Sequence, residues 1–143
     1  MSMELHVLSD LQLKSIGEWQ QAIENEKYPL QLASDTNLSS VDGLLPSIIE
    51  GRRTGFECYH DDSIETMGFL GWNHFPHRWT FAIGLRWRGD IDELLAAWMA
   101  ATAYAAATAG VVFDHEQAIV LTPEESRKIV EKILMARPRF DVA

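Results

Sequence analysis

Five side chains able to do chemistry lie within six residues, between Glu57 and Asp62. General acid–base catalysis needs a titratable group within hydrogen-bond reach of its target, so His60 with Asp62 is one candidate pair. A nucleophilic cysteine needs a nearby base that a third group orients, so Cys58 with His60 is another. These two residues lie on one face of a predicted strand, about 7 Å apart at their Cα atoms. No cysteine-protease sequence surrounds Cys58. A simpler interpretation is that Cys58 is a small core residue and that His60 and Asp62 are solvated at the end of the strand.

Histidines elsewhere give no stronger signal for a metal site. His74 and His77 form an HxxH pair, but Pro76 prevents a regular helix there and no further ligand follows at metal-site spacing. The sequence 114–116, Asp-His-Glu, lies at a predicted hairpin tip without an evident partner. The glycine-rich phosphate loops and the GxSxG and HExxH motifs do not occur. We therefore expect no metal, no cofactor and no catalytic activity.

Length and composition favour one domain in a reducing compartment. A chain of 143 residues is long enough for one domain, expected over 1–143, with a substantial core. Its single cysteine, Cys58, cannot form an intramolecular disulfide. The longest apolar stretch, 94–109, is too short to span a bilayer, and the beginning of the sequence lacks the pattern of an export signal. We expect a cytoplasmic protein that does not contact membranes.

The net charge of −9 is concentrated in the first half of the chain. Residues 1–71 contain twelve acidic and four basic side chains, a net charge of −8, whereas residues 72–143 contain nine and eight, a net charge of −1. Such a surface repels nucleic acid and attracts a basic protein. A net negative charge of this kind is also common in small proteins, where it only increases solubility.

The segment 79–114 contains the clearest structural pattern. Large apolar residues alternate with smaller or polar ones over 79–87, which predicts a β-strand with one apolar side. The small residues Ala82 and Gly84 favour close packing of a helix on the other side. After a turn, apolar residues recur at three- and four-residue steps over 91–109, which predicts a long alanine-rich helix.

The other predicted elements are shorter. Strands are expected at 4–8, 30–33, 54–60, 111–113 and 118–121, and helices at 16–26, 41–50 and 123–135. Segment 61–78 is too apolar for a free loop, so it either packs as a lid over the sheet or forms an extra strand near 67–72. Consecutive strands exclude a purely parallel sheet. The order predicts an α+β fold with a mixed or mainly antiparallel sheet of about five to six strands and about four helices.

The C-terminal part of the sequence resembles a known class of bacterial proteins. Its alanine-rich helix continues into Gly110–Asp114 and then Leu121–Glu125, with the sequence Thr-Pro-Glu-Glu at a helix start. This arrangement resembles the closing half of small immunity proteins encoded beside polymorphic or contact-delivered toxins. The resemblance covers the last third to half of the chain and implies a non-catalytic inhibitor of one cognate toxin.

That function would place the binding surface on the acidic first half, facing a basic toxin domain. The expected partner-binding residues are Glu24, Glu26, Asp35, Asp42, Glu57, Asp61, Asp62, Phe69 and Trp72. Two other functions fit the same sequence. One is an effector or secretion chaperone that binds an unfolded segment through Phe69 and Trp72, and the other is a small enzyme with its site near Glu57–Asp62. A monomer and a homodimer are both compatible with the composition.

Overall fold

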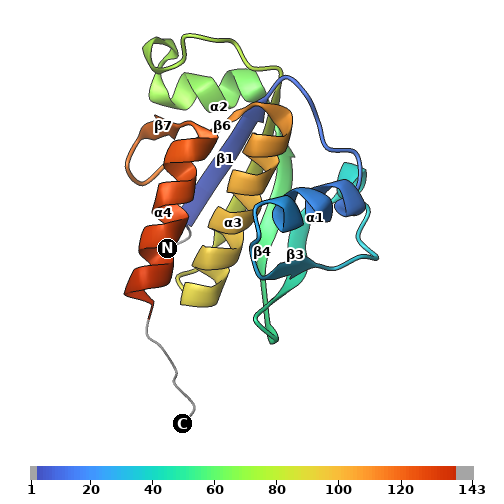
Figure 1. The fold of residues 1–143 in the computed structure, drawn as a ribbon. Helices are drawn as coiled ribbons and strands as arrows, with labels where there is room; N and C mark the ends of the chain where they lie inside the picture. Colours follow the sequence, from blue (N-terminus) through green and yellow to red (C-terminus); the bar gives the residue numbers. More distant parts are fainter. Residues whose placement is uncertain (1–2, 138–143) are drawn as a thin grey trace.

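The computed structural model describes residues 3–137, which form one seven-stranded antiparallel sheet and four α-helices (Figure 1). The strands are β1 (Met3–Ser9), β2 (Leu30–Leu32), β3 (Gly43–Ile49), β4 (Arg52–Asp61), β5 (Phe81–Trp87), β6 (Val111–Asp114) and β7 (Ile119–Leu121). The α-helices are α1 (Ile16–Asn25), α2 (Ser63–Leu70), α3 (Ile91–Thr108) and α4 (Pro123–Ala136), with short 3-10 helices η1 (Leu38–Ser40) and η2 (Trp72–His74). This confirms the predicted α+β class, although the sheet has more strands than expected.

The first strand lies inside the sheet rather than at its edge. The strand order is β2-β3-β4-β5-β1-β6-β7, so β1 pairs with both β5 and β6. Residues from the beginning, middle and end of the sequence are therefore neighbours in the sheet. No helix within residues 3–137 is long and apolar enough to cross a membrane.

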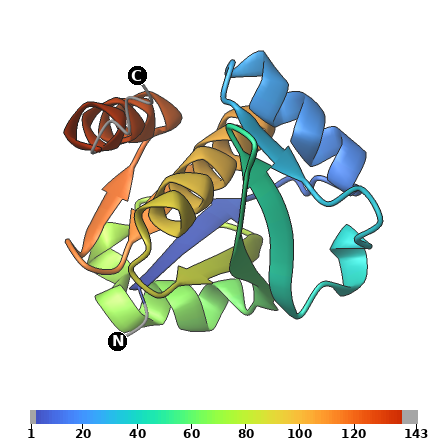
Figure 2. The same ribbon diagram turned by 90° about the horizontal axis from the view of Figure 1, so that it is seen from below.

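Helices α1, α3 and α4 cover one face of the sheet, and α2 lies against the other (Figure 2). The main core lies between α3 and the apolar side of β5, which comprises Ile83, Leu85 and Trp87. The small residues of β5 face the other side, where Ala82 packs with the segment that contains α2; the sequence left open which helix meets which side. The small side chains at the contact between α3 and β5 belong to the helix, whose buried alanines let it approach the large side chains of the strand.

The segment 41–50 is strand β3 and not the predicted helix. Its buried side chains Leu45, Ser47 and Ile49 alternate with the exposed Leu44 and Ile48. The two pairs of adjacent apolar residues also fit helical spacing, and a serine in the buried row hides the alternation. The carbonyl oxygen of the proline in this strand accepts a hydrogen bond from the backbone N–H of Ala33, directly after the end of β2, so the N–H that proline lacks is missing only where this pairing ends.

Segment 61–78 packs as a lid, and no strand forms near 67–72. It contains α2 and η2, and it covers one end of the second face of the sheet. Met67 and Phe75 are buried there in a small second core with Leu8, Ala82 and Phe113. The apolar residues that made this segment unsuitable as a free loop thus anchor it to the sheet.

The start of α4 is capped as expected, whereas α3 ends at Thr108, and Ala109 rather than the expected Gly110 is its left-handed cap residue. Gly110 follows α3 where a Cβ atom would lie 2.3 Å from the carbonyl oxygen of Leu8, so the close approach of the chain to β1 requires glycine. At the start of α4, Thr122 and Glu125 form a complete capping box. Ser15 also caps α1, although Glu18 bonds the backbone of Lys14 rather than that of the cap residue.

Candidate functional site

Polar side chains cross the face of the sheet that α3 does not cover. Directly opposed residues of antiparallel strands share a face, and one such row contains Leu44, Glu57, Arg86 and Glu4. The next row contains Tyr59, Gly84, His6 and Phe113. We use the term open face for the part of this surface that α2 leaves uncovered, comprising Glu4, His6, Leu44, Glu57, Tyr59, Asp61, Gly84, Arg86 and the adjoining His115.

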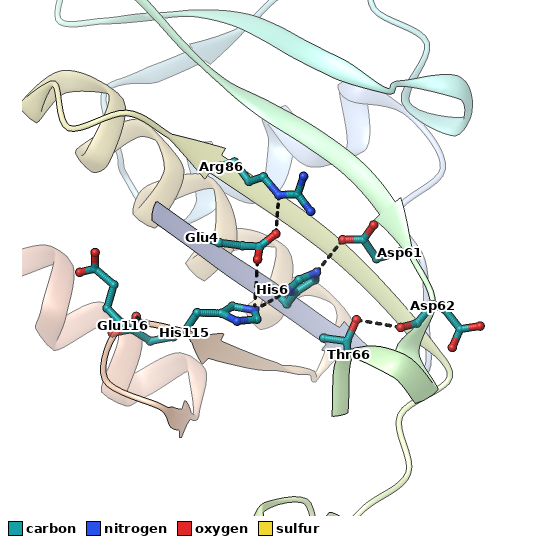
Figure 3. A network of polar contacts seen from close by, with 9 residues as sticks. Glu4, His6, Asp61, Asp62, Thr66, Arg86, His115 and Glu116 are labelled. Carbon is teal, nitrogen blue, oxygen red and sulfur yellow. Dashed lines mark hydrogen bonds and ion pairs between the residues drawn. The ribbon is translucent and has the colours of Figure 1, made fainter. Parts of the chain in front are cut away.

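The centre of the open face is a contact between His6 and Asp61 across an intervening strand (Figure 3). His6 is on β1 and Asp61 on β4, and β5 lies between them. The His6 Nε2 and the Asp61 Oδ2 are 2.6 Å apart, and only 4% of His6 is exposed. A Cβ atom on Gly84 of β5 would lie 2.6 Å from that Asp61 oxygen and 3.0 Å from His6 Nε2. The absence of a side chain at Gly84 thus makes room for the contact.

Three further residues extend this contact into a network. The Nδ1 of His6 lies 2.6 Å from the Nε2 of His115, which follows β6. Arg86 donates from Nε to one carboxylate oxygen of Glu4 at 2.5 Å, and the other oxygen lies 3.7 Å from His115 Nε2 (Figure 3). Glu4, His6 and His115 each direct one potential metal-ligand atom into a space where all three lie within 4.8 Å of one another.

The surroundings of His115 favour its neutral form. Its ring stacks on Phe113 with 4.3 Å between centroids, and 25% of its side chain is exposed. Burial, followed by the neighbouring His6, lowers the pKa of His115 below its ordinary value. The imidazole therefore keeps a free lone pair at neutral pH, as a metal ligand or a proton acceptor requires.

Beside this network lies an acidic patch, formed by Asp42, Leu44, Glu57 and Tyr59. The Tyr59 hydroxyl donates to Glu57 at 2.8 Å, and this bond is the main cause of the raised pKa of Tyr59, to which Asp42 also contributes. Among the described residues, no basic side chain forms an ion pair with Asp42 or Glu57. Leu44 stands opposite Glu57 and is 67% exposed. The patch thus combines unpaired carboxylates with an exposed apolar side chain.

The residues from Glu57 to Asp62 do not meet in one site. Cys58 is fully buried in the main core, and burial raises the pKa of its thiol to about 12. The Nε2 of His60 lies 2.7 Å from the carbonyl oxygen of Leu38, whereas the Asp62 carboxylate caps the first turn of α2. Glu57 and Asp61 point to the open face, where they contact Tyr59 and His6 respectively.

The other expected partner-binding acids are dispersed. Glu24 is exposed on α1, on the opposite side of the sheet, and Asp35 is exposed in the loop after β2. Glu26 accepts two hydrogen bonds from Arg127 and so connects α1 to α4. Of the expected partner-binding acids that precede β3, only Asp42 adjoins the open face.

The exposed aromatic residues lie on the lid. Phe69 on α2 is 85% exposed, whereas Trp72 is 39% exposed and lies beneath the guanidinium group of Arg78. Of the HxxH pair, His77 lies 2.6 Å from Asp10, and His74 is exposed nearby on η2. These two histidines do not converge with further ligands in the described part of the chain.

Sequence reasoning missed Glu4, His6, His115 and Arg86 as members of a site. Glu4 and His6 alternate on one face of a predicted strand, and an isolated glycine interrupts another strand at Gly84, which often marks a close approach. These signals become informative only when the strand order is known, because β1, β4, β5 and β6 are far apart in the sequence.

Comparisons with protein-family models, with curated proteins and with solved structures found no match to this chain. The functional interpretation therefore depends on the geometry of the open face.

Proposed function

We propose that this protein binds a basic protein domain through the acidic patch of its open face. The observation that carries the proposal is the position of Leu44, 67% exposed on a sheet strand directly opposite Glu57. Protein interfaces commonly combine a desolvated apolar centre with a polar rim. Leu44 would supply part of that centre, and Ile48, which is 43% exposed and lies four residues further along the same face of β3, would extend it.

The charge of the patch specifies the chemistry of the partner. Asp42 and Glu57 have no basic partner within residues 3–137, so their carboxylates are available to lysine or arginine side chains. Complementary charge accelerates association and excludes acidic partners. A net charge of −9 adds a long-range attraction for a basic domain.

Inhibition of a toxin is the specific form of binding that we infer. The resemblance of the C-terminal part to immunity proteins supports it, as does the match between an acidic surface and the basic surface of a nuclease-type toxin. Such inhibition requires no catalytic group in this chain, because the bound protein itself occludes the toxin.

One observation favours a second function. Phe69 and Ile64 are 85% and 64% exposed on α2, and exposed apolar side chains on one helix are typical of a surface that binds an apolar segment. A secretion chaperone would use this surface and not the acidic patch. Phe69→Ser would then abolish binding, whereas charge reversal on the sheet would leave binding unchanged.

Affinity capture with matched variants distinguishes these functions. The tagged wild-type chain, an Asp42→Lys/Glu57→Lys variant and a Glu24→Lys control would each be incubated with lysate of the source organism. We expect wild type and control to retain the same basic protein in stoichiometric amount, and the double variant to lose it. Raising the salt concentration should release this protein, because salt screens exposed charges. Equal retention by all three chains would contradict the proposal. So would the loss of capture in a fourth chain, Phe69→Ser, if the double variant still bound.

A further inference from the structure

We propose that Glu4, His6 and His115 form a binding site for a divalent transition-metal ion, represented by Zn²⁺. Two histidines and one carboxylate are a donor set of zinc sites that leave the fourth position to solvent. Glu4 and His6 are two residues apart on β1 and point to the same face, and His115 reaches them from the turn after β6 (Figure 3). A rigid central strand and an adjoining turn therefore present the three ligands.

Groups outside the ligand set already orient two of these ligands. Asp61 holds the Nε2 of His6, leaving Nδ1 to face the other ligands, and Arg86 holds the second oxygen of Glu4. Metal-bound histidines usually donate their other ring N–H to a carboxylate or carbonyl oxygen in this way. The supporting groups come from β4 and β5, so the arrangement depends on the tertiary fold and not on one local motif.

Hydrogen-bond chemistry specifies which nitrogen of His6 is free. An ionised carboxylate only accepts hydrogen bonds, so its partner Nε2 carries a proton and Nδ1 is the nitrogen that can offer a lone pair to a metal ion. Without a metal, His6 Nδ1 and His115 Nε2 lie 2.6 Å apart, so a proton between them forms a hydrogen bond that joins the two rings. A metal ion would take the place of that shared proton.

The space between the ligands can adapt to a metal ion. Two nitrogen ligands that each bind a tetrahedral metal ion at about 2.1 Å are about 3.4 Å apart. His6 Nδ1 and His115 Nε2 are 2.6 Å apart, so binding requires the two rings to separate by about 1 Å. His6 is held on β1, whereas His115 lies in the turn between β6 and β7 and is 25% exposed on its side chain. We expect His115 to make this movement, and solvent to fill the fourth position because 23% of Glu4 is also exposed.

Metal titration of the purified, tag-free chain tests this site without any partner. After removal of metals by a chelator, calorimetry with ZnCl₂ should give one site per chain and thermal unfolding should shift upward. Co²⁺ should replace Zn²⁺ and give the visible absorption bands of a four-coordinate ion. His115→Gln should abolish saturable binding, and Asp61→Asn, which removes a supporting group, should weaken it by about 10–100-fold.

Two controls keep the test decisive. His77→Gln alters the exposed HxxH pair and should leave the affinity unchanged. Circular dichroism of each variant confirms folding, and His115→Gln, in a turn, is the substitution that least disturbs the sheet. No saturable binding up to about 1 mM Zn²⁺, or binding that survives His115→Gln but not His77→Gln, would overturn the proposal.

Discussion

Asp61 and His6 form a hydrogen bond above Gly84, a residue of the strand that separates them. The contact joins β4 to β1 without either strand pairing with the other. The imidazole of His6 is buried at this contact, and a side chain at position 84 would clash with both partners, so this glycine allows the network to form.

Gly84→Ala should destabilise the protein and separate the two side chains. The new Cβ atom would lie 2.6 Å from Asp61 Oδ2, so the carboxylate must rotate away and leave a buried nitrogen of His6 unpaired. We expect a loss of about 1–3 kcal/mol in the free energy of unfolding, measured with urea. Gly68→Ala is the matched control, because its Cβ atom would meet nothing closer than 3.9 Å. A loss of equal size in both variants would contradict the role of Gly84.

Leu44 and Leu45 are adjacent, but truncation should destabilise the protein strongly only at Leu45. Leu45 is fully buried in the main core, so Leu45→Ala should cost about 2–5 kcal/mol of stability. Leu44 is 67% exposed, and Leu44→Ala should change stability by no more than about 0.5 kcal/mol. A helix over 41–50 would bury both residues on one side, so similar losses in the two variants would contradict strand β3.

The Cys58 thiol should resist alkylation while the chain is folded. Burial raises its pKa to about 12, so about one thousandth of the native thiol is ionised at pH 9. Iodoacetamide should therefore modify the native protein only as fast as it unfolds, and modify the urea-unfolded protein rapidly. Rapid modification of the native chain, with a pH dependence that follows an ordinary thiol pKa, would contradict the burial of this side chain.

The ion pair of Arg52 and Asp92 should give a pH-dependent contribution to stability. Two hydrogen bonds from Arg52, at 2.8 and 2.9 Å, lower the pKa of Asp92. A carboxyl whose pKa is lower in the folded state stabilises the protein above its unfolded pKa of 3.8, and this contribution disappears as the pH falls through the folded pKa.

Arg52→Gln should therefore lower the free energy of unfolding slightly at pH 7 and not at all near pH 2, since solvent screens this exposed pair. The neighbouring Arg53→Gln serves as the control, because Arg53 is exposed and lies on the other side of the sheet strand. Denaturant unfolding across this pH range measures both variants. If the stability difference between wild type and Arg52→Gln were as large at pH 2 as at pH 7, charge pairing would not be its cause.

Sequence periodicity predicted the elements whose pattern extends over many residues. The long helix α3, strand β5 and the capped helix α4 all have such patterns. Strand β3 was predicted incorrectly, because its seven residues contain apolar pairs that fit both periods. Only the pairing of β3 with β2 and β4 selects the strand, and that pairing is a tertiary interaction.

The polar network depends on strand order even more strongly. Glu4 and His6 precede Asp61, Arg86 and His115 by long stretches of sequence, and they meet because β1 inserts between β5 and β6. His115 was expected to be exposed at a hairpin tip without a partner, but the turn instead brings its ring against His6 and Phe113. Local sequence cannot specify such an insertion, since both edges of a growing sheet offer equivalent hydrogen bonds.

The central claim is that the acidic patch inhibits a basic toxin, and a growth assay tests it most directly. The basic protein captured by the wild-type chain would be expressed from an inducible promoter, alone and with each variant of this chain. We predict that the protein arrests growth, and that wild type and Glu24→Lys restore it whereas Asp42→Lys/Glu57→Lys does not. Absence of growth arrest, or equal rescue by all three chains, would contradict the proposed function.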